Sequence, residues 1–303
     1  MYSTNEIKQG VIDGNFLLLA KAISFVENDA EGSDIFLQNL LPENVPVIGI
    51  TGPPGAGKST LISALIGSWI QSNKKVAILS IDPSSPFHKG AILGDRIRMK
   101  DWYLHPNVFI RSLASRGHLG GLNHNIVELT TLLQSVGFDY IIVETVGVGQ
   151  SEVDVAALAD TTVVVLVPEA GDAVQMMKSG LLEIADIFVV NKSDRPDAET
   201  FANHIREMVA DNVKESIAPA VISTVASQQL GIDELIIALE KHHHLKDKSG
   251  RLLQLRMNKL VQLILAHKMK SMNMDSLKNE LSSSIGDPHF NLFSYFQKII
   301  KNE

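Results

Sequence analysis

The chain has 303 residues, 45% of them hydrophobic and 20% charged, which is the composition of a globular protein with room for one large domain. A net charge of −7 argues against a broad nucleic-acid-binding surface, and the lack of any cysteine excludes disulfides and thiolate metal sites. The apolar runs are strand-sized and the first residues carry no signal-peptide pattern, so we expect a cytoplasmic protein that binds neither membrane nor nucleic acid.

The first 44 residues are predicted to form a helical extension. Apolar side chains such as Leu19, Ile23 and Val26 recur there at helical spacing. The tripeptide Asp13-Gly14-Asn15 is a turn signal that interrupts this pattern, and a second short helix is expected over residues 35–41. We expect these helices to cover the main domain.

Residues 45–245 are predicted to form one α/β domain. Short runs of apolar, β-branched residues alternate with helical segments, which favours a mostly parallel sheet covered by helices on both faces. Ligands bind such sheets at the carboxyl ends of the strands. Helices are expected at 58–72 and from Ile232 to His244. The predicted strands cover residues 47–51, 76–81, 108–113, 139–144, 162–167, 187–191 and 219–224.

Residues 246–303 are predicted to form a C-terminal arm that begins with a charged hinge, Lys246 to Gly250, and is helical over residues 251–303. The arm is rich in apolar side chains on one side, among them Leu252, Leu255 and Leu263. Such a surface either folds back on its own domain or pairs with a second subunit.

A phosphate-binding loop is predicted directly after the first strand. The segment GPPGAGKS matches G-x-x-x-x-G-K-[ST] between a strand and a helix, and the alternative is a chance glycine-rich turn. Glycines let backbone N–H groups reach phosphate oxygens, and the helix N-terminus adds partial positive charge. Lys58 is expected to reach the β- and γ-phosphates, and the Ser59 hydroxyl to hold Mg²⁺. The predicted nucleotide contacts in this loop are Gly52, Pro53, Pro54, Gly55, Ala56, Gly57, Lys58, Ser59 and Thr60.

A guanine-reading sequence follows the sixth predicted strand. Asn191-Lys192-Ser193-Asp194 matches N-K-x-D, which GTPases carry at this place. The Asp194 carboxylate can accept hydrogen bonds from guanine N1–H and the 2-amino group, which adenine does not offer. Lys192 can pack its stem along the base, and Asn191 can tie loops together. The alternative is a helix that begins with Asp194 as its cap.

An acidic residue, Glu144, ends the fourth predicted strand at the place where GTPases carry D-x-x-G. An acid here approaches Mg²⁺, and the N–H of Gly147 can sense the γ-phosphate. Val148 stands where Ras-like proteins carry their catalytic glutamine, so Gln150 is the nearest residue that could position water, and we expect slow intrinsic hydrolysis. The alternative for Glu144 is a carboxylate that faces solvent.

Two further loops carry candidate residues. Asp82 ends the second predicted strand and would face the γ-phosphate and Mg²⁺, and Asp95 is another candidate metal ligand. The glycine-rich stretch with Arg116 and His118 is either a switch region ordered by nucleotide or an ordinary solvated loop. Residues 169–172 form either another loop near the nucleotide or a simple turn.

Together these segments closely resemble the MeaB/ArgK/MMAA GTPases, over roughly residues 5–245. The resemblance implies a chaperone that protects a cobalamin-dependent acyl-CoA mutase of the methylmalonyl-CoA mutase type and gates its loading with adenosylcobalamin, using GTP as the timer. It also implies an extra switch loop at 169–178, a homodimer through helical C-terminal arms, and Mg²⁺ held by Ser59, Asp82, Asp95 and Glu144. The segments that carry the resemblance are Gly52 to Thr60, Asp82 to Pro86, Gly90 to Arg96, Arg116 to Gly121, Glu144 to Glu152 and Asn191 to Asp194.

One loop departs from the family pattern. Val225-Ala226 stands where the family has Ser-Ala, so a serine contact is lost, although the Ala226 N–H could still meet guanine O6. We expect Val225, Ala226 and Ser227 to lie around the base. Two other functions compete: a nickel-type metal-insertion GTPase, whose members usually carry Cys and His motifs, and a P-loop kinase, for which no separate acceptor site is visible.

Overall fold

The protein is described by a computed structural model that covers residues 2–82, 99–114, 125–145, 151–168, 181–212 and 218–245, with isolated positions from Gln254 to Asn291. The chain divides into two compact units, Met1–Leu255 and Arg256–Glu303. Within these described residues, no helix is both long and apolar enough to cross a membrane.

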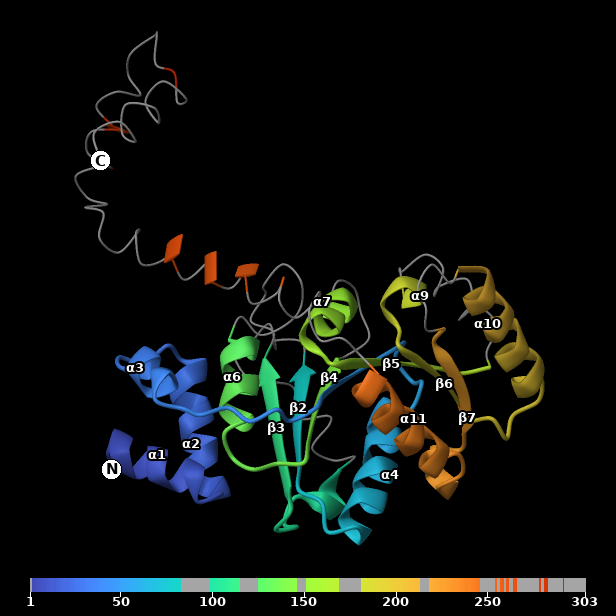
Figure 1. Cartoon of the computed structure of the whole chain (residues 1–303), viewed down its shortest axis with the longest axis horizontal. Coiled ribbons are helices and arrows are strands. Elements are labelled where there is room, and N and C mark those ends of the chain that lie inside the picture. The colour runs from blue at the N-terminus through green and yellow to red at the C-terminus, as the bar shows by residue number, and fades with distance from the viewer. Residues whose placement is uncertain are drawn as a thin grey trace. The chain divides into compact units, whose positions relative to one another are not determined.

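A seven-stranded sheet forms the centre of the first unit, and all neighbouring strands are parallel (Figure 1). The strand order is β3-β2-β4-β1-β5-β6-β7, which places β1 between β4 and β5. The predicted strands are confirmed to within one residue at each end. The strands are β1 (Val47–Thr51), β2 (Val76–Asp82), β3 (Val108–Ala114), β4 (Tyr140–Thr145), β5 (Thr161–Leu166), β6 (Ile187–Asn191) and β7 (Ala220–Thr224).

Helices connect the strands and precede the sheet. The helix expected at 58–72 ends one residue earlier, and the short helix expected at 35–41 begins two residues earlier and ends at Gln38. The α-helices are α1 (Thr4–Ile12), α2 (Phe16–Glu27), α3 (Ser33–Gln38), α4 (Lys58–Gln71), α6 (Ile126–Leu133), α7 (Ser151–Leu158), α9 (Leu181–Ile184), α10 (Ala198–Asn212) and α11 (Ile232–Leu245), and the 3-10 helices are η1 (Lys100–Trp102) and η2 (Ala226–Gln228).

Both faces of the sheet are covered, which explains why the central strands β1, β5 and β6 are buried along their whole length. Successive side chains of a strand point to opposite faces. Ala77 and Leu79 of β2 therefore pack in the core that contains α2, α6 and α7. Val76 and Ile78 pack in the core formed with α4 and α11.

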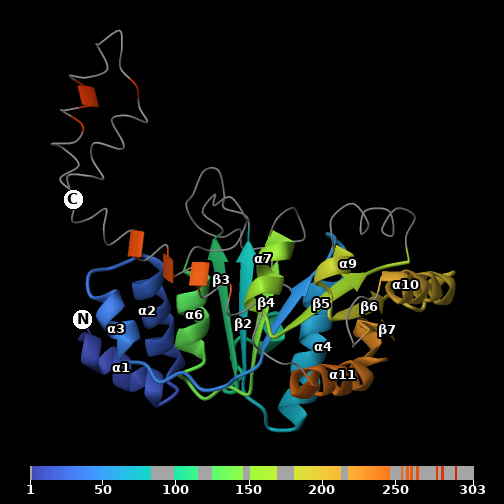
Figure 2. The ribbon, with the colours of Figure 1, turned by 45° about the horizontal axis from the view of Figure 1, so that its top comes forward.

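The N-terminal helices α1, α2 and α3 lie beside α6, at the β3 end of the sheet (Figures 1 and 2). The ring of Phe16 on α2 lies 5.4 Å from that of Phe109 on β3. Arg111 of β3 donates a hydrogen bond to Ser24 Oγ at 3.0 Å and pairs with Glu27 Oε2 at 3.3 Å. These helices therefore share the hydrophobic core of the sheet, as expected for a cover.

Beyond Leu255, the positions that the structure describes include a set of apolar side chains at helical positions. Met257, Leu260 and Ile264 are each about half exposed, at 48%, 50% and 50%. Their spacing of three and four residues puts them on one helix face. The second unit thus carries an exposed apolar stripe.

Candidate nucleotide-binding site

The loop between β1 and α4 has a backbone that requires glycine at two positions. Gly52 has a φ of 137° and Gly57 a φ of 90°, which side chains other than glycine rarely allow. A Cβ at Gly52 would also collide with the carbonyl of Val165 on β5, and a Cβ at Gly57 with the amide of Asn191. The loop is therefore packed closely between β5 and the end of β6.

The N-terminus of α4 opens into this loop. The helix begins at Lys58, and no described side chain caps it. The first N–H groups of a helix lack intrahelical partners and carry the positive end of the helix dipole. Pro54, Gly55 and Thr60 are exposed around this end, whereas Ala56 is buried. The arrangement is one by which proteins bind phosphate.

The Lys58 ammonium lies against the same loop. The residue is 7% exposed, and its Nζ donates hydrogen bonds to the carbonyl oxygens of Gly52 at 2.8 Å and Pro53 at 3.2 Å. A buried cation needs such partners. The contacts hold the positive charge at the loop that is predicted to receive the phosphates.

Ser59 and Glu144, which are far apart in the sequence, meet at this edge of the sheet. The Ser59 hydroxyl donates to Glu144 Oε1 at 2.9 Å, and both residues are 3% exposed. The hydroxyl of Ser80, which pairs in register with Glu144, donates to Oε2 at 3.4 Å. The interpretation of Glu144 as a solvent-facing carboxylate is therefore wrong. Sequence reasoning missed Ser80, although a serine inside an apolar strand is a signal for a buried polar contact.

The remaining predicted phosphate-side residues are only partly described. Asp82 is the last residue of β2 and pairs in register with Ala114, so its backbone lies at the carboxyl edge of the sheet near the end of β4. The predictions for Asp95, Arg116, His118, Gly147, Val148, Gln150 and residues 169–178 lie outside the described residues.

The side chain of Asn191, at the end of β6, joins two loops to each other. Its Nδ2 donates to the Ala56 carbonyl at 2.9 Å. Its Oδ1 accepts hydrogen bonds from Thr224 Oγ1 at 3.1 Å and from the Ala226 N–H at 3.2 Å. Asn191 is 2% exposed and Thr224 is fully buried. One amide thus connects the phosphate loop with the loop after β7, and sequence reasoning did not find Thr224.

Lys192 and Asp194 lie in the turn that follows β6. Lys192 has a φ of 57°, and its Nζ donates to the Gly55 carbonyl at 2.7 Å. Asp194 is exposed, and α10 begins only at Ala198, so the interpretation of Asp194 as a helix cap is wrong. Its carboxylate is accessible to a ligand beside the phosphate loop.

The loop after β7 completes the described part of the site. Val225 and Ala226 are buried, at 6% and 5% exposure, and Ser227 is exposed. The Ala226 N–H, which was expected to meet guanine O6, donates to Asn191 Oδ1 here. Asn191 therefore fixes the position of this N–H in the structure.

The residues present fit a nucleoside triphosphate with Mg²⁺. Two glycines leave no room for side chains along the loop, and an uncapped helix start and a lysine supply positive charge. The Ser59 hydroxyl and the Glu144 carboxylate lie 2.9 Å apart and offer the hard oxygen ligands that Mg²⁺ prefers.

Comparison with known sequences places this site in a defined group. The family described as methylmalonyl Co-A mutase-associated GTPase MeaB matches residues 19–284. A putative GTPase of Pyrococcus abyssi is 43% identical over 266 residues, covering 86% of this chain and 82% of the relative. GTPase ArgK of Escherichia coli is 37% identical, covering 82% of this chain and 78% of the relative. The mouse protein described as methylmalonic aciduria type A homolog, mitochondrial, is 34% identical, and the alignment covers 80% of this chain and 64% of that relative.

A solved structure agrees with these matches. The crystal structure of a LAO/AO transport system kinase has a TM-score of 0.66 and 25% identity, and the alignment covers 98% of this chain and 96% of the other. All the described residues of the site lie inside the range that the family matches.

Proposed function

This chain belongs to the MeaB family of methylmalonyl-CoA mutase-associated GTPases, and we propose that it uses GTP hydrolysis to protect a cobalamin-dependent acyl-CoA mutase and to gate its cofactor loading. The match over residues 19–284 is the observation that carries this proposal. It favours the mutase over the metal-insertion and kinase alternatives.

At the phosphates, each residue has a proposed task. The loop from Gly52 to Thr60 would bind the phosphate oxygens through backbone N–H groups, and Lys58 would leave its carbonyl partners to meet the β- and γ-phosphates. Ser59, Asp82, Asp95 and Glu144 would hold Mg²⁺, which neutralises charge on the phosphates when bound. Gln150 is the residue proposed to orient the attacking water.

At the base, Asp194 would select guanine, and Asn191 would hold the loops that flank it. The exposure of Asp194 and the three hydrogen bonds of Asn191 support these tasks. The side chain of Lys192, tied to the Gly55 carbonyl, would cover one face of the base. Such a site discriminates against adenine because adenine would leave the carboxylate without partners.

Hydrolysis is proposed to be slow until a partner binds, because Val148 stands where an efficient GTPase of the Ras type has glutamine. We also propose that the protein works in the cytoplasm as a homodimer joined through residues 246–303. The exposed apolar stripe that includes Met257, Leu260 and Ile264 supports the dimer.

Single-turnover GTPase rates, measured with and without a candidate mutase, test the proposal. We expect a low intrinsic rate, an increase with the mutase, and capture of the mutase by the protein that depends on whether GDP or a GTP analogue is bound. The Lys58→Ala variant, which should lose triphosphate binding, is the control. An intrinsic rate on the order of 1 s⁻¹, typical of an unassisted enzyme, or a mutase that neither binds nor accelerates hydrolysis, would count against it.

A further inference from the structure

Two buried hydroxyl groups bond to each other at the ends of the strands β1 and β4. Thr51 is the last residue of β1 and directly precedes the phosphate loop, and Thr145 is the last residue of β4 and directly follows Glu144. Thr51 is 0% and Thr145 1% exposed, and the Thr145 hydroxyl donates to Thr51 Oγ1 at 2.9 Å. One side-chain contact thus connects the two segments that carry the phosphate loop and the predicted metal ligand.

This hydroxyl pair lies on the face of the sheet opposite the predicted metal site. Ile50 packs in the core with α4, and Glu144, its partner in register, contacts Ser59 at the start of α4. Val143 packs in the other core, which contains α7. Since side chains alternate between the faces along a strand, Thr145 shares the face of Val143. The pair therefore lies behind the Glu144 carboxylate, not beside it.

The pair takes over where the backbone pairing of β1 with β4 ends. The last residues of these two strands that pair in register are Ile50 and Glu144, and Thr51 pairs onward with β5. On its other side, Thr145 still pairs with Ile81 of β2. The end of β4 is therefore held by the sheet ladder on the β2 side and by the hydroxyl pair on the β1 side.

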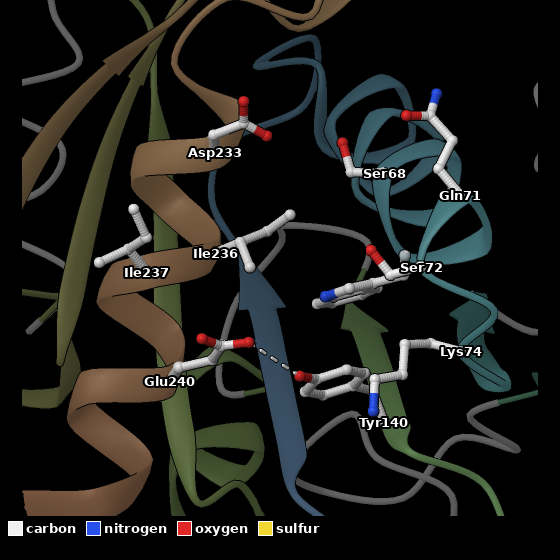
Figure 3. A pocket seen from close by; sticks show the side chains of 10 residues that line it. Ser68, Gln71, Ser72, Lys74, Tyr140, Asp233, Ile236, Ile237 and Glu240 are labelled. Carbon is white, nitrogen blue, oxygen red and sulfur yellow. Dashed lines mark hydrogen bonds between the residues drawn. The ribbon is translucent and has the colours of Figure 1, made fainter.

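The rest of β4 is fixed by packing. Tyr140 at its start stacks on Trp69 of α4, with ring centroids 4.4 Å apart, and its hydroxyl donates to Glu240 of α11 at 3.3 Å (Figure 3). Residues 141–143 are fully buried in the cores of both faces. A closely packed strand cannot slide as a unit. The position of Glu144 thus depends on the contacts at the carboxyl end of β4.

We propose that Thr51 and Thr145 are positioning residues for GTP hydrolysis. Their hydrogen bond fixes the end of β4 against the start of the phosphate loop and so sets where the Glu144 carboxylate meets Mg²⁺. This inference rests on the proposed function, in which Glu144 holds the metal. A buried hydroxyl that loses its partner costs free energy, so the pair resists displacement of either strand end.

The Thr145→Val variant keeps the shape of the side chain and removes the hydroxyl. In the full-length protein, the Mg²⁺ concentration for half-maximal single-turnover GTP hydrolysis should rise about three- to tenfold, as expected for the loss of one hydrogen bond. The affinity for GDP in EDTA, without Mg²⁺, should stay within about twofold of wild type, because the phosphate loop is unchanged. Thr145→Ser restores the hydroxyl and should restore the wild-type Mg²⁺ dependence.

Two further variants and a matched control show whether the bond itself matters. Thr51→Val should have the same effect as Thr145→Val, and the double variant should be no worse than either, because all three remove one bond. Thr130→Val removes a hydroxyl of equal burial on α6, which is 4% exposed and donates to the Ile126 carbonyl at 2.8 Å. This control should lower the free energy of unfolding and leave the Mg²⁺ dependence unchanged.

The Glu144→Ala variant separates this inference from the proposed function. If Glu144→Ala hydrolyses GTP normally, the proposed metal site is wrong and the inference falls with it. If Glu144→Ala is impaired but Thr51→Val and Thr145→Val keep the wild-type Mg²⁺ dependence, the metal site stands and the positioning role is overturned. The role is also overturned if the two effects add in the double variant, or if GDP affinity in EDTA falls as much as the response to Mg²⁺.

Discussion

At the predicted metal site, the single carboxylate of Glu144 on β4 connects the helix α4 with the strand β2. Glu144 is almost fully buried, and the hydroxyls of Ser59 and Ser80 donate to its two oxygens. Hydroxyl groups can rotate and act as donors or acceptors. Ser59 can therefore turn its lone pairs toward a cation while Glu144 stays in place, which is what a shared metal site requires of these residues.

The Glu144→Ala variant should lower Mg²⁺-dependent GTP turnover by about 10² or more, because a carboxylate that acts on the reacting phosphate contributes more to the transition state than to product binding. GDP affinity should change less than about tenfold. Ser80→Ala removes only the 3.4 Å contact and should keep near-normal turnover. Normal hydrolysis in Glu144→Ala would place this residue away from the metal.

The exposed carboxylate of Asp194 should decide which base is bound. In Asp194→Asn, an NH₂ donor replaces one of the two carboxylate oxygens that accept hydrogen bonds from guanine. We therefore expect the affinity for GDP to fall by about 10² or more and the affinity for xanthosine diphosphate to rise. Asp197→Asn is a matched control in the same turn, since asparagine tolerates the φ of 64° found there. Titration of both nucleotides measures the outcome, and an unchanged preference for GDP in Asp194→Asn would refute the assignment.

At the scale of whole elements, the sequence predicted the strands well because most of them are short apolar runs, and β1, β5 and β6 are buried runs rich in β-branched residues. It predicted less well where a helix starts after a turn. The sequence allowed Asp194 to be a helix cap. In the structure, Lys192 has a left-handed backbone conformation, a turn follows it, and α10 begins only at Ala198. Contacts between elements, such as Thr224 with Asn191, could not be predicted because they depend on which strands become neighbours.

One such contact between elements should be visible in the pH dependence of stability. Burial, and after it the Glu240 carboxylate, raise the pKa of Tyr140 to about 12 from its usual value near 10. The folded state favours the neutral phenol, so its contribution to stability is complete below pH 10 and is lost as the pH rises toward 12.

Wild type should therefore lose more free energy of unfolding than Tyr140→Phe between pH 9 and pH 11.5. Urea unfolding of both proteins at the two pH values measures this difference. The other tyrosines and the lysines titrate in both proteins, so the comparison isolates Tyr140. Equal losses would mean that burial and Glu240 do not raise the pKa of Tyr140 in the folded state.

At the scale of the whole molecule, the strand order is the part that the sequence left open. A mostly parallel sheet was predicted, but β1 pairs with β4 and β5, whose residues lie about a hundred positions further along the chain. Local patterns carry no information on such pairings. The phosphate loop and the guanine reader were nevertheless located from sequence, because each has a short motif directly after a strand.

Removal of the chain after Lys246 should yield a monomer that still binds GDP. Every nucleotide motif lies before this point, whereas the exposed stripe, Met257, Leu260, Val261, Ile264 and Leu265, lies after it. In a two-fold dimer one stripe can bury itself against its copy. Light scattering measures the molar mass of both proteins. A monomeric full-length chain would contradict the dimer proposal, and a truncated chain that is still a dimer would show that the interface lies outside residues 247–303.

The packing of the phosphate loop also has a consequence for folding during translation. The loop at Gly52 is synthesised early, but it rests on Val165, Asn191 and, through Asn191, Ala226. At about 5–20 residues per second, translation from Gly52 to Ala226 takes on the order of ten to thirty seconds. We therefore expect that the nascent chain does not bind nucleotide during that time. Stalled chains that end before Asn191 should not be retained by immobilised GDP, whereas chains that extend beyond α11 should be.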